Sequence, residues 1–356
     1  MLFLADFPDE SRRHEGMSQR MITIDELCRH KARTYLVVSH RFYWHMETVP
    51  ISDNAIQYRY NTFRHFFRIR KMLAAADTLY FHSVLNVLPL LPFLFFIKKK
   101  AWVILDAHGV VPEEARYNGQ VLKGWLYQLA ERIIFKRVNK VITVSDAMAA
   151  HFRKKHSQWN GVYLKYPIIP AHIGTATGIG RPDEPALQEG RTHVLYSGNL
   201  QSWQNIDLMI NLIKQNQSGR VKYTIMTGEP AEMVRRLGEA GIRQGNDIEV
   251  LTVAPNELAR YYRAAHYGFI LRDDMLINRV ACPTKMVEYL YYGIIPVVKS
   301  SEMGDFNALG YEYVAYEDFT DELPPRKSRV NEEIISAYVA GPRALDIEKI
   351  VGREKY

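Results

Sequence analysis

Short apolar runs, each followed by a polar turn or a helical pattern, recur along most of the chain. They are residues 35–40, 78–82, 102–108 and 141–145 in the first half, and 193–198, 223–228, 248–252, 267–271 and 294–298 in the second half. Unbroken apolar runs are typical of parallel strands that are covered on both faces. Residues 205–216 and 255–265 place apolar side chains at helical spacing. This alternation predicts an α/β fold made of βαβ units and doubly wound sheets.

A chain of 356 residues is too long for one ordinary core, so we expect two domains. Residues 167–191 are rich in Gly, Pro and polar residues and indicate a linker. The expected domains are Rossmann-like, one over 1–170 and one over 190–335, and face each other across a cleft. A C-terminal helix at about 335–356 is expected to pack back on the first domain. Ligands of such sheets bind beyond the carboxyl ends of the strands, so residues that follow strands are the candidate site residues.

Bulk composition restricts the class of protein. Apolar residues make up 47% of the chain and charged residues 24%, as in soluble globular proteins. The two cysteines, Cys28 and Cys282, lie far apart, which argues against a disulfide framework and favours the cytoplasm. No Cys/His cluster indicates a zinc site, and the N-terminus lacks the pattern of a secretory signal. Segment 84–97 is too short to span a bilayer; we expect a buried helix, with an interfacial segment as the alternative.

The formal net charge is +7 and the pI about 9.1. This balance favours an anionic partner, such as a phosphorylated ligand, acidic lipid or nucleic acid, although simple solubility explains it equally well. No recognised nucleic-acid-binding motif accompanies the charge, so nucleic acid is the least favoured partner.

The run 193–198 ends in a glycine, which opens a loop that leads into a helical pattern. Glycine allows close approach of the backbone to a ligand, and N–H groups at a helix start attract phosphate. An ordinary turn is the alternative. The candidate binding residues in this loop are Gly198, Asn199, Gln201, Trp203 and Gln204. Neither a GxGxxG fingerprint nor a phosphate-binding P-loop motif occurs, which disfavours dinucleotide redox chemistry and ATP hydrolysis.

Two further loops follow strands of the second half. Thr227 and Gly228 follow the apolar residues YTIM at 223–226, and Val253 follows the run 248–252. These residues are candidates for lining a base pocket. Ordinary turns are again the alternative.

Arg272 leaves a buried strand, and Lys285 stands three residues before Glu288. An arginine at a strand end is well placed to bind a diphosphate, with Lys285 as a second cation. Thr284 is a candidate cap of the helix that follows. A carboxylate one helical turn from Lys285 suits sugar hydroxyls, so we interpret Glu288 as a ribose ligand. The alternative is a surface ion pair at i,i+3.

In the first half, His108 ends the run 102–108, directly after its buried apolar part, and is a candidate to bind substrate or transfer protons, with a structural histidine as the alternative. Glu113 and Glu114 are candidates for a helix cap or for acceptor binding. Gly16 precedes a helix expected to begin near Ser18, in a loop suited to closing over a diphosphate.

These segments resemble the group 1, or family 4, glycosyltransferases of the GT-B fold, of the type that builds bacterial surface polysaccharides. The stretch 283–298, PTKMVEYLYYGIIPVV, resembles their P-[ST]-K-x-x-E motif, and LYSGNLQSWQNIDLMI resembles the first strand, loop and helix of their donor domain. DAHGVVPEE and VNKVITVSDAM are similar to segments of their acceptor domain. The resemblance spans roughly residues 1–320 and is more specific in the second half.

The resemblance implies a retaining hexosyltransferase that needs neither a metal ion nor a resident cofactor. The first domain is expected to bind the acceptor and the second a nucleotide-sugar, most often UDP- or GDP-linked. Glu288 is expected at the donor ribose, Thr284 and Lys285 at the diphosphate, His108 beside the transferred sugar and Gly16 near the phosphates. We assign His108, Arg272 and Lys285 as catalytic.

The sequence departs from the family pattern at positions where many members carry charge. Asn199 and Gln204 stand where an Arg and a Lys are usual, and Val280 where a Glu is usual. Arg272 and Lys285 are then expected to supply the charge at the diphosphate. The departures also leave two alternatives open, a nucleotide-sugar 2-epimerase-like enzyme and a non-catalytic partner subunit of the same fold.

Segments 58–73 and 130–140 mix basic and aromatic side chains in the first half. Such a face suits anionic lipid. We therefore hypothesise peripheral attachment to the inner face of the plasma membrane and a saccharide acceptor linked to a lipid diphosphate, with a solvated helix face as the alternative.

Overall fold

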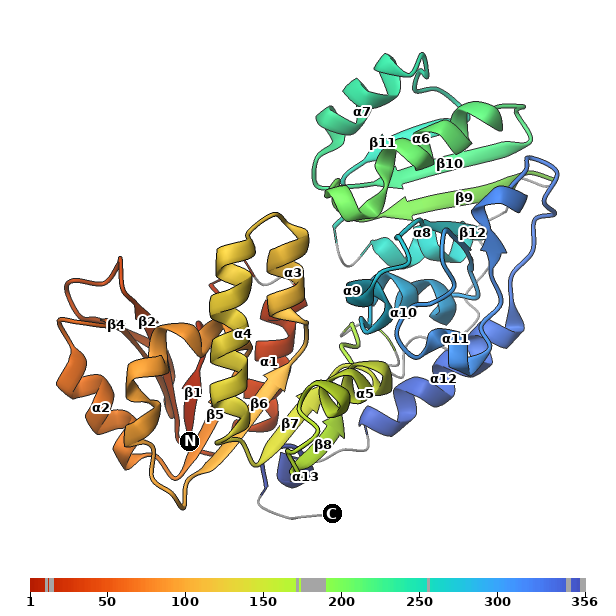
Figure 1. The fold of residues 1–356 in the computed structure, drawn as a ribbon. Coiled ribbons are helices and arrows are strands. Elements are labelled where there is room, and N and C mark those ends of the chain that lie inside the picture. Colours follow the sequence, from red (N-terminus) through yellow and green to blue (C-terminus); the bar gives the residue numbers. More distant parts are fainter. Residues whose placement is uncertain are drawn as a thin grey trace. The chain divides into compact units, whose positions relative to one another are not determined.

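The computed structural model describes residues 1–9, 12, 16–170, 173, 190–254, 257–343 and 347–352. The chain divides into two compact units (Figure 1). Unit 1 comprises Met1–Ile168 and Pro342–Tyr356, and unit 2 comprises Ile169–Gly341. Most of the predicted linker at 167–191 lies outside the described residues. Each unit holds its own parallel sheet and is described by itself.

The sheet of unit 1 has the strand order β3-β4-β2-β1-β5-β6-β7-β8. Neighbouring strands are parallel, except that β3 runs antiparallel to β4. The strands are β1 Leu2–Leu4, β2 Arg33–Ser39, β3 Glu47–Ser52, β4 Ala55–Asn61, β5 Thr78–Phe81, β6 Trp102–Ala107, β7 Lys140–Thr143 and β8 Val162–Lys165. The helices are α1 Gly16–Leu27, α2 Phe66–Ala75, α3 Val111–Tyr117, α4 Val121–Phe135, α5 Asp146–Lys155 and α13 Ile347–Val351.

Segment 84–97 does not form the buried α-helix that its composition predicts. It forms two 3₁₀ helices, η2 Val84–Asn86 and η3 Leu88–Phe96. Pro92 lies inside η3 and cannot donate a backbone hydrogen bond, which disfavours an α-helix here. Phe93 and Leu94 are buried, but Phe95 is 78% exposed, so this segment contributes apolar surface as well as core.

The sheet of unit 2 has the order β11-β10-β9-β12-β13-β14, and all of its neighbouring strands are parallel. The strands are β9 Thr192–Ser197, β10 Val221–Met226, β11 Ile248–Leu251, β12 Tyr267–Ile270, β13 Ile295–Val298 and β14 Val314–Ala315. The helices are α6 Ile206–Gln215, α7 Pro230–Glu239, α8 Leu258–Ala264, α9 Leu276–Arg279, α10 Thr284–Tyr291, α11 Phe306–Leu309 and α12 Arg329–Arg343, with 3₁₀ turns η4 Ser202–Gln204 and η5 Tyr316–Asp318.

Every apolar run that predicts a strand forms one, which confirms the α/β class. β1, β3, β4, β8 and β14 were not predicted. β1 and β14 are very short, and β3 is an exposed edge strand whose side chains show no alternation in burial. A pattern of apolar residues detects strands buried on both faces and misses strands of these kinds.

The strand orders place a topological switch point in each sheet. In unit 2 the chain runs outward from β9 to β10 and β11, then returns to the other side of β9 as β12 and β13. In unit 1 the corresponding point lies between β1 and β5. Ligands of open α/β sheets bind beyond the carboxyl ends of the strands at such points. The residues after β9, β12 and β5 therefore define where a site is expected.

Helix α13 packs into unit 1, where Ile350 and Val351 join the core that contains Phe3 and Tyr35. The Lys140 side chain, on β7, is 1% exposed. Its Nζ donates to the carbonyl oxygens of Lys349 at 2.7 Å and Gly352 at 3.1 Å. A cation at the carbonyl end of a helix satisfies otherwise unpaired acceptors and interacts favourably with the helix dipole.

We expect Lys140→Met to loosen this C-terminal segment, because methionine fills similar space but cannot donate to the two carbonyls. The cost should be about 1–3 kcal/mol, as for hydrogen bonds to a charged group. Hydrogen exchange should show faster exchange of the amides in 347–351, and chemical denaturation a lower midpoint. The exposed Lys136→Met is the matched control; equal exchange in both variants would contradict the assigned role.

Candidate functional site

In unit 2, four of the predicted residues meet at the carboxyl ends of β9 and β12. Lys285 extends from α10 and is 7% exposed. Its Nζ lies 3.4 Å from Gln204 Oε1 and 3.9 Å from the centre of the Tyr196 ring. Gly198 follows β9 and Arg272 follows β12. The switch point of the sheet thus gathers side chains separated by more than 80 positions in the sequence.

Lys285 is buried and Arg272 is half-buried, and neither has a counter-ion among the described residues. Burial lowers the pKa of Lys285 well below its usual range, and the neighbouring Arg272 lowers it further. Loss of hydration also lowers the pKa of Arg272, whose Nε is shielded from solvent and has no hydrogen-bond partner in the described part of the chain. Among the described residues, no carboxylate oxygen lies within 4.0 Å of either cation. An unpaired buried charge costs several kcal/mol, so the pair favours an anionic ligand.

The backbone around Lys285 is shaped to admit its ammonium group. A Cβ on Gly198 would lie 2.8 Å from Lys285 Nζ, so glycine is needed at this position for the close approach of the side chain. Asn205 adopts the left-handed conformation, with φ 51° and ψ 50°, which Asn tolerates better than most residues. Its amide donates to the carbonyl of Leu271 at 2.7 Å. This bond ties the loop after β9 to the end of β12, next to Arg272.

Glu288 lies one turn beyond Lys285 on α10. The Tyr262 hydroxyl donates to Glu288 Oε2 at 3.1 Å and lies 3.0 Å from Ser197 Oγ. Burial raises the pKa of Glu288 to about 7, although the hydrogen bond from Tyr262 opposes the shift. The charged atoms of Glu288 and Lys285 are not within ion-pair distance, so the surface ion pair that the sequence left open is not found. Glu288 is half-buried at the same sheet edge as the two cations.

The other predicted donor-side residues vary in exposure. Asn199 and Gln201 are exposed, and the Asn199 amide donates to Gln201 Oε1 at 2.7 Å. Trp203 is half-buried in η4. Thr227 is 5% exposed, and its carbonyl accepts a hydrogen bond from Thr252 Oγ1 at 2.8 Å. Gly228 is exposed and Val253 half-buried, each after the end of its strand.

The role predicted for Thr284 as a helix cap is wrong. Thr284 is the first residue of α10, and Pro283 occupies the cap position without a side-chain hydrogen bond. Pro283 has an extended backbone, with φ −67° and ψ 126°, and cannot donate a backbone hydrogen bond itself. Val280, one of the departures from the resembled family pattern, is 3% exposed.

In unit 1, His108 belongs to a buried group of polar side chains at the carboxyl ends of β5 and β6. Arg20, on α1, donates to both oxygens of Asp106, at 2.8 and 2.9 Å, and the Tyr80 hydroxyl also donates to Asp106. Burial alone would raise the pKa of Asp106, but Arg20 holds it well below its usual range. The opposite charges of Arg20 and Asp106 neutralise each other, unlike the two cations of unit 2.

His108 is the least satisfied member of this group. Its side chain is 6% exposed, Nδ1 lies 3.9 Å from Asp106 Oδ1, and neither ring nitrogen has a hydrogen-bond partner among the residues that the structure describes. The His82 ring lies 4.6 Å away between ring centres, and His82 Nε2 contacts the Met17 carbonyl at 3.0 Å. Burial lowers the pKa of His82 to about 3, so His82 is neutral. Three imidazole nitrogens, Nδ1 of His82 and both of His108, therefore have no hydrogen-bond partner among the described residues and remain for a ligand.

His82, Asp106 and His108 each offer an atom within 4.8 Å of the others, as metal ligands would. The donor set does not fit a metal ion. Both oxygens of Asp106 already accept hydrogen bonds from Arg20, whose guanidinium places a positive charge where a metal would add another. We interpret this group as an ion pair flanked by two imidazoles.

The remaining predictions for unit 1 have mixed outcomes. Glu113 forms an ion pair with Lys155 at 2.7 Å, and Glu114 Oε1 accepts from the Val110 amide at 3.0 Å at the start of α3. Glu114 is therefore a capping residue. Helix α1 begins at Gly16 itself, two residues earlier than expected, and the preceding residues 13–15 lie outside the described part of the chain.

The sequence reading missed Arg20, His82 and Tyr262. His82 had a visible signal, because it directly follows the run that forms β5, as His108 follows β6. Arg20 and Tyr262 had none. Each is defined by a partner far away in the chain, Asp106 and Glu288 respectively, and only the folded structure brings them together.

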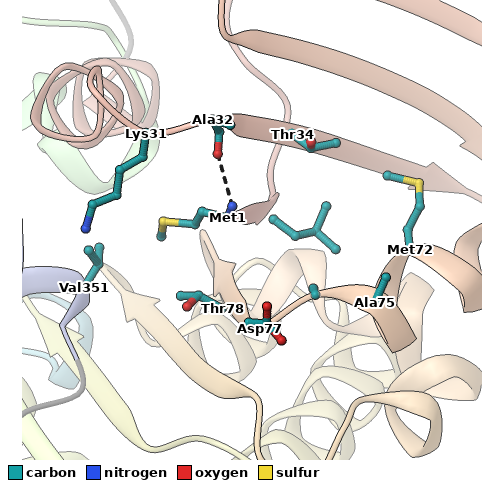
Figure 2. Close-up of a pocket in the computed structure, with 11 residues that line it drawn as sticks. Met1, Lys31, Ala32, Thr34, Met72, Ala75, Asp77, Thr78 and Val351 are labelled. Atoms are coloured by element: carbon teal, nitrogen blue, oxygen red, sulfur yellow. Dashed lines mark hydrogen bonds between the residues drawn. The ribbon is translucent and has the colours of Figure 1, made fainter.

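Hollows elsewhere on the surface do not contain these groups. One of about 690 Å³ in unit 1 is lined by Leu2, Thr34 and Thr78, near the amino ends of β1, β2 and β5, together with Met1, Lys31 and Asp77 (Figure 2). One of about 580 Å³ in unit 2 includes Arg191 and Lys222, near the amino ends of β9 and β10. Both lie at the edge opposite the polar clusters, where parallel sheets do not usually bind ligands. We base the site on the chemistry of the clusters.

Comparison with known proteins agrees with this fold. No family model and no curated protein sequence matches the chain. Among solved structures, sucrose-phosphate synthase from Thermosynechococcus elongatus matches with a TM-score of 0.57 and 16% identity, covering 99% of this chain and 91% of that one. HepE from Anabaena, in complex with UDP and glucose, matches with a TM-score of 0.56 and 12% identity, covering 99% and 93%.

A third structure, described as trehalose-6-phosphate from E. coli bound with UDP-2-fluoro glucose, matches with a TM-score of 0.54 and 11% identity, covering 99% of this chain and 92% of that one. Identities this low establish the fold alone. The chain has the GT-B fold, with two parallel-sheet domains, over nearly its whole length.

Proposed function

We propose that the protein is a glycosyltransferase that moves a sugar from a nucleotide-sugar to a saccharide acceptor. The observation that carries this proposal is the position of two cations, Lys285 (buried) and Arg272 (half-buried), at the switch point of the sheet in unit 2, where no carboxylate among the described residues pairs with them. A diphosphate would supply the missing negative charge. Glu288, half-buried at the same edge, suits the ribose hydroxyls of the nucleotide.

The proposed reaction uses these cations when the donor bond breaks. The bond between the anomeric carbon and the diphosphate oxygen breaks, and its electron pair stays on the diphosphate. The acceptor oxygen forms the new bond on the same face, so the configuration is retained, and its proton passes to the leaving phosphate. Lys285 and Arg272 stabilise the charge that develops on that phosphate, an effect worth about 3–4 kcal/mol per donor in enzymes. We propose that no metal ion or resident cofactor is required.

Similar folds support a uridine nucleotide as the first donor to test. HepE was solved with UDP and glucose, and another match with UDP-2-fluoro glucose. We propose a UDP- or GDP-linked hexose as donor for this chain. Unit 2 would hold the donor, and His108 of unit 1, with both ring nitrogens unpaired, would contact the transferred sugar.

For the acceptor we propose a saccharide linked to a lipid diphosphate, in the synthesis of a surface polysaccharide by a cytoplasmic enzyme. No helix among the described residues is long and apolar enough to cross a membrane. Such an acceptor would be reached from the membrane surface. The excess of positive charge in unit 1 supports this choice, because a lipid diphosphate is anionic.

Thermal unfolding with UDP-, GDP-, ADP- and CMP-sugars tests the donor site. We expect one nucleotide class to raise the melting temperature of the wild type. Lys285→Met should abolish that rise and at the same time stabilise the free protein at neutral pH by roughly 1–3 kcal/mol, because an unpaired buried charge is replaced by an apolar side chain of similar length.

The gain in stability expected of Lys285→Met follows from the lowered pKa of Lys285. The buried lysine resists protonation in the folded protein, so it costs stability at every pH below its unfolded value and the cost grows until the folded pKa is reached. Lys214→Met, on the exposed face of α6, is the matched control and should change neither quantity. A destabilised Lys285→Met that still responds to the nucleotide would reject the diphosphate assignment.

Glu288 gives a pH-dependent test of the ribose assignment. Its pKa is about 7 when folded and near 4.5 when unfolded, so the wild type loses stability as pH rises from about 4.5 to 7. Glu288→Gln lacks this loss. Urea denaturation should show the variant gaining stability relative to the wild type by on the order of 3 kcal/mol between pH 4.5 and 8, while its response to nucleotide disappears. A pH-independent difference would contradict the burial of an ionisable carboxyl group.

A further inference from the structure

The positive charge of this protein is concentrated in one stretch of unit 1. Residues 54–105 contain Arg59, Arg64, Arg68, Arg70, Lys71, Lys98, Lys99 and Lys100, and a single acidic residue, Asp77. Eight basic residues against one acidic give +7, which equals the formal charge of the whole chain. The other residues therefore balance to zero. A charge that is evenly spread for solubility would not show this concentration.

Helix α2 presents an aromatic side chain surrounded by cations. Ile69 and Leu73 face the core, and Phe67, on the opposite side, is 77% exposed. Arg64, Arg68, Arg70 and Lys71 are all exposed around it. None of these four forms an ion pair with a carboxylate among the described residues. The Arg70 guanidinium instead lies 4.7 Å from the centre of the Phe96 ring, on η3.

The neighbouring elements extend this surface with apolar side chains. Phe95 of η3 is 78% exposed. On α4, Leu122, Trp125, Leu126 and Leu129 are 75, 60, 41 and 50% exposed and follow the helical spacing i, i+3, i+4, i+7. A regular apolar stripe on the solvent side of a helix needs a partner that is also apolar.

These three elements form one layer. Helices α2 and α4 both pack against η3, and Figure 1 shows α2 and α4 within unit 1 beside its strands. We call the exposed side chains of α2, η3 and α4 the helical face. Most of segment 130–140, which the sequence suggested for this surface, does not belong to it, because Ala130, Glu131, Ile134, Phe135, Val138 and Lys140 are buried.

We propose that the helical face docks on a bilayer that contains anionic phospholipid. The exposed Phe, Trp and Leu side chains would enter the interface, where aromatic residues are favoured, and the surrounding Arg and Lys would meet lipid phosphates. An apolar protein partner would explain the stripe of α4 but not the ring of cations around Phe67. The two features together match a surface that is negatively charged outside and apolar beneath.

Vesicle flotation tests the proposal with the full chain. We expect binding to vesicles of phosphatidylcholine with about 30% phosphatidylglycerol, weaker binding at high salt, and none to phosphatidylcholine alone. R64Q/R68Q/K71Q should lower the partition coefficient about 100-fold, since each basic residue near the surface contributes about fivefold. F67S/W125S should also lower the partition coefficient. This loss should change less with salt concentration than the loss in R64Q/R68Q/K71Q.

The matched control removes the same charge from unit 2. K214Q/R220Q/R243Q changes three exposed residues and should bind vesicles within about threefold of the wild type, as expected if position rather than net charge decides. Wild-type protein that stays unbound at low salt would overturn the proposal, and so would equal losses in both triple variants. Wild type that self-associates through residues 67 and 125 but does not float would identify a protein interface instead.

The same variants separate this inference from the proposed activity. The changed residues lie outside the group formed by Gly198, Arg272, Lys285 and Glu288, so the nucleotide-dependent rise in melting temperature should be identical in wild type and variants. Variants that no longer float but keep the nucleotide-dependent rise in melting temperature would support a role of the helical face in docking and not in nucleotide binding. A missing nucleotide response in the wild type would reject the proposed donor site while leaving the vesicle result to stand on its own.

Discussion

The constraint on which the cluster at the carboxyl ends of β9 and β12 depends is the pairing of buried Lys285 with half-buried Arg272, with no acidic partner among the described residues. Two cations that lose hydration and also repel each other cost free energy, and the rest of the cluster makes the arrangement possible. Gly198 leaves room for the ammonium group, the Tyr196 ring lies against it, and Asn205 fixes the loop to the end of β12. A diphosphate would relieve this cost on binding, because it supplies the negative charge that no described side chain provides.

In unit 1, by contrast, the buried charges are paired with each other. Arg20 and Asp106 neutralise each other through two short hydrogen bonds, and Tyr80 adds a third to the carboxylate. The pair holds the start of α1 against the end of β6 and leaves the nitrogens of His108 unsatisfied beside it. The Arg20–Asp106 ion pair neutralises its own charges and stabilises a fixed geometry. Lys285 and Arg272 in unit 2 have no such neutralising partner among the described residues, so their charge favours an anionic ligand. The contrast fits a division between positioning in one domain and charge stabilisation in the other.

The surface of unit 1 adds a second use of charge. The exposed cations on α2 form no ion pairs with other described residues, so they contribute little to folding and remain available to an anionic surface. The polar groups at the strand ends and the helical face consist of different residues. The proposed attachment to lipid and the proposed binding of a nucleotide are therefore separable by mutation.

The sequence by itself determined the fold class and several members of the site. Strands covered on both faces must be continuously apolar, so the runs at 102–108 and 267–271 marked β6 and β12, and the residues after them, His108 and Arg272, stood out. Lys285 and Glu288 were visible from their spacing on one helix. Only the tertiary structure decided that β12 returns beside β9, which brings Arg272 and Lys285 to Gly198. It alone paired Arg20 with Asp106 and Tyr262 with Glu288, and left Phe67 and Trp125 exposed. Local patterns report periodicity and burial, while strand order and side-chain partners depend on contacts between residues distant in the chain.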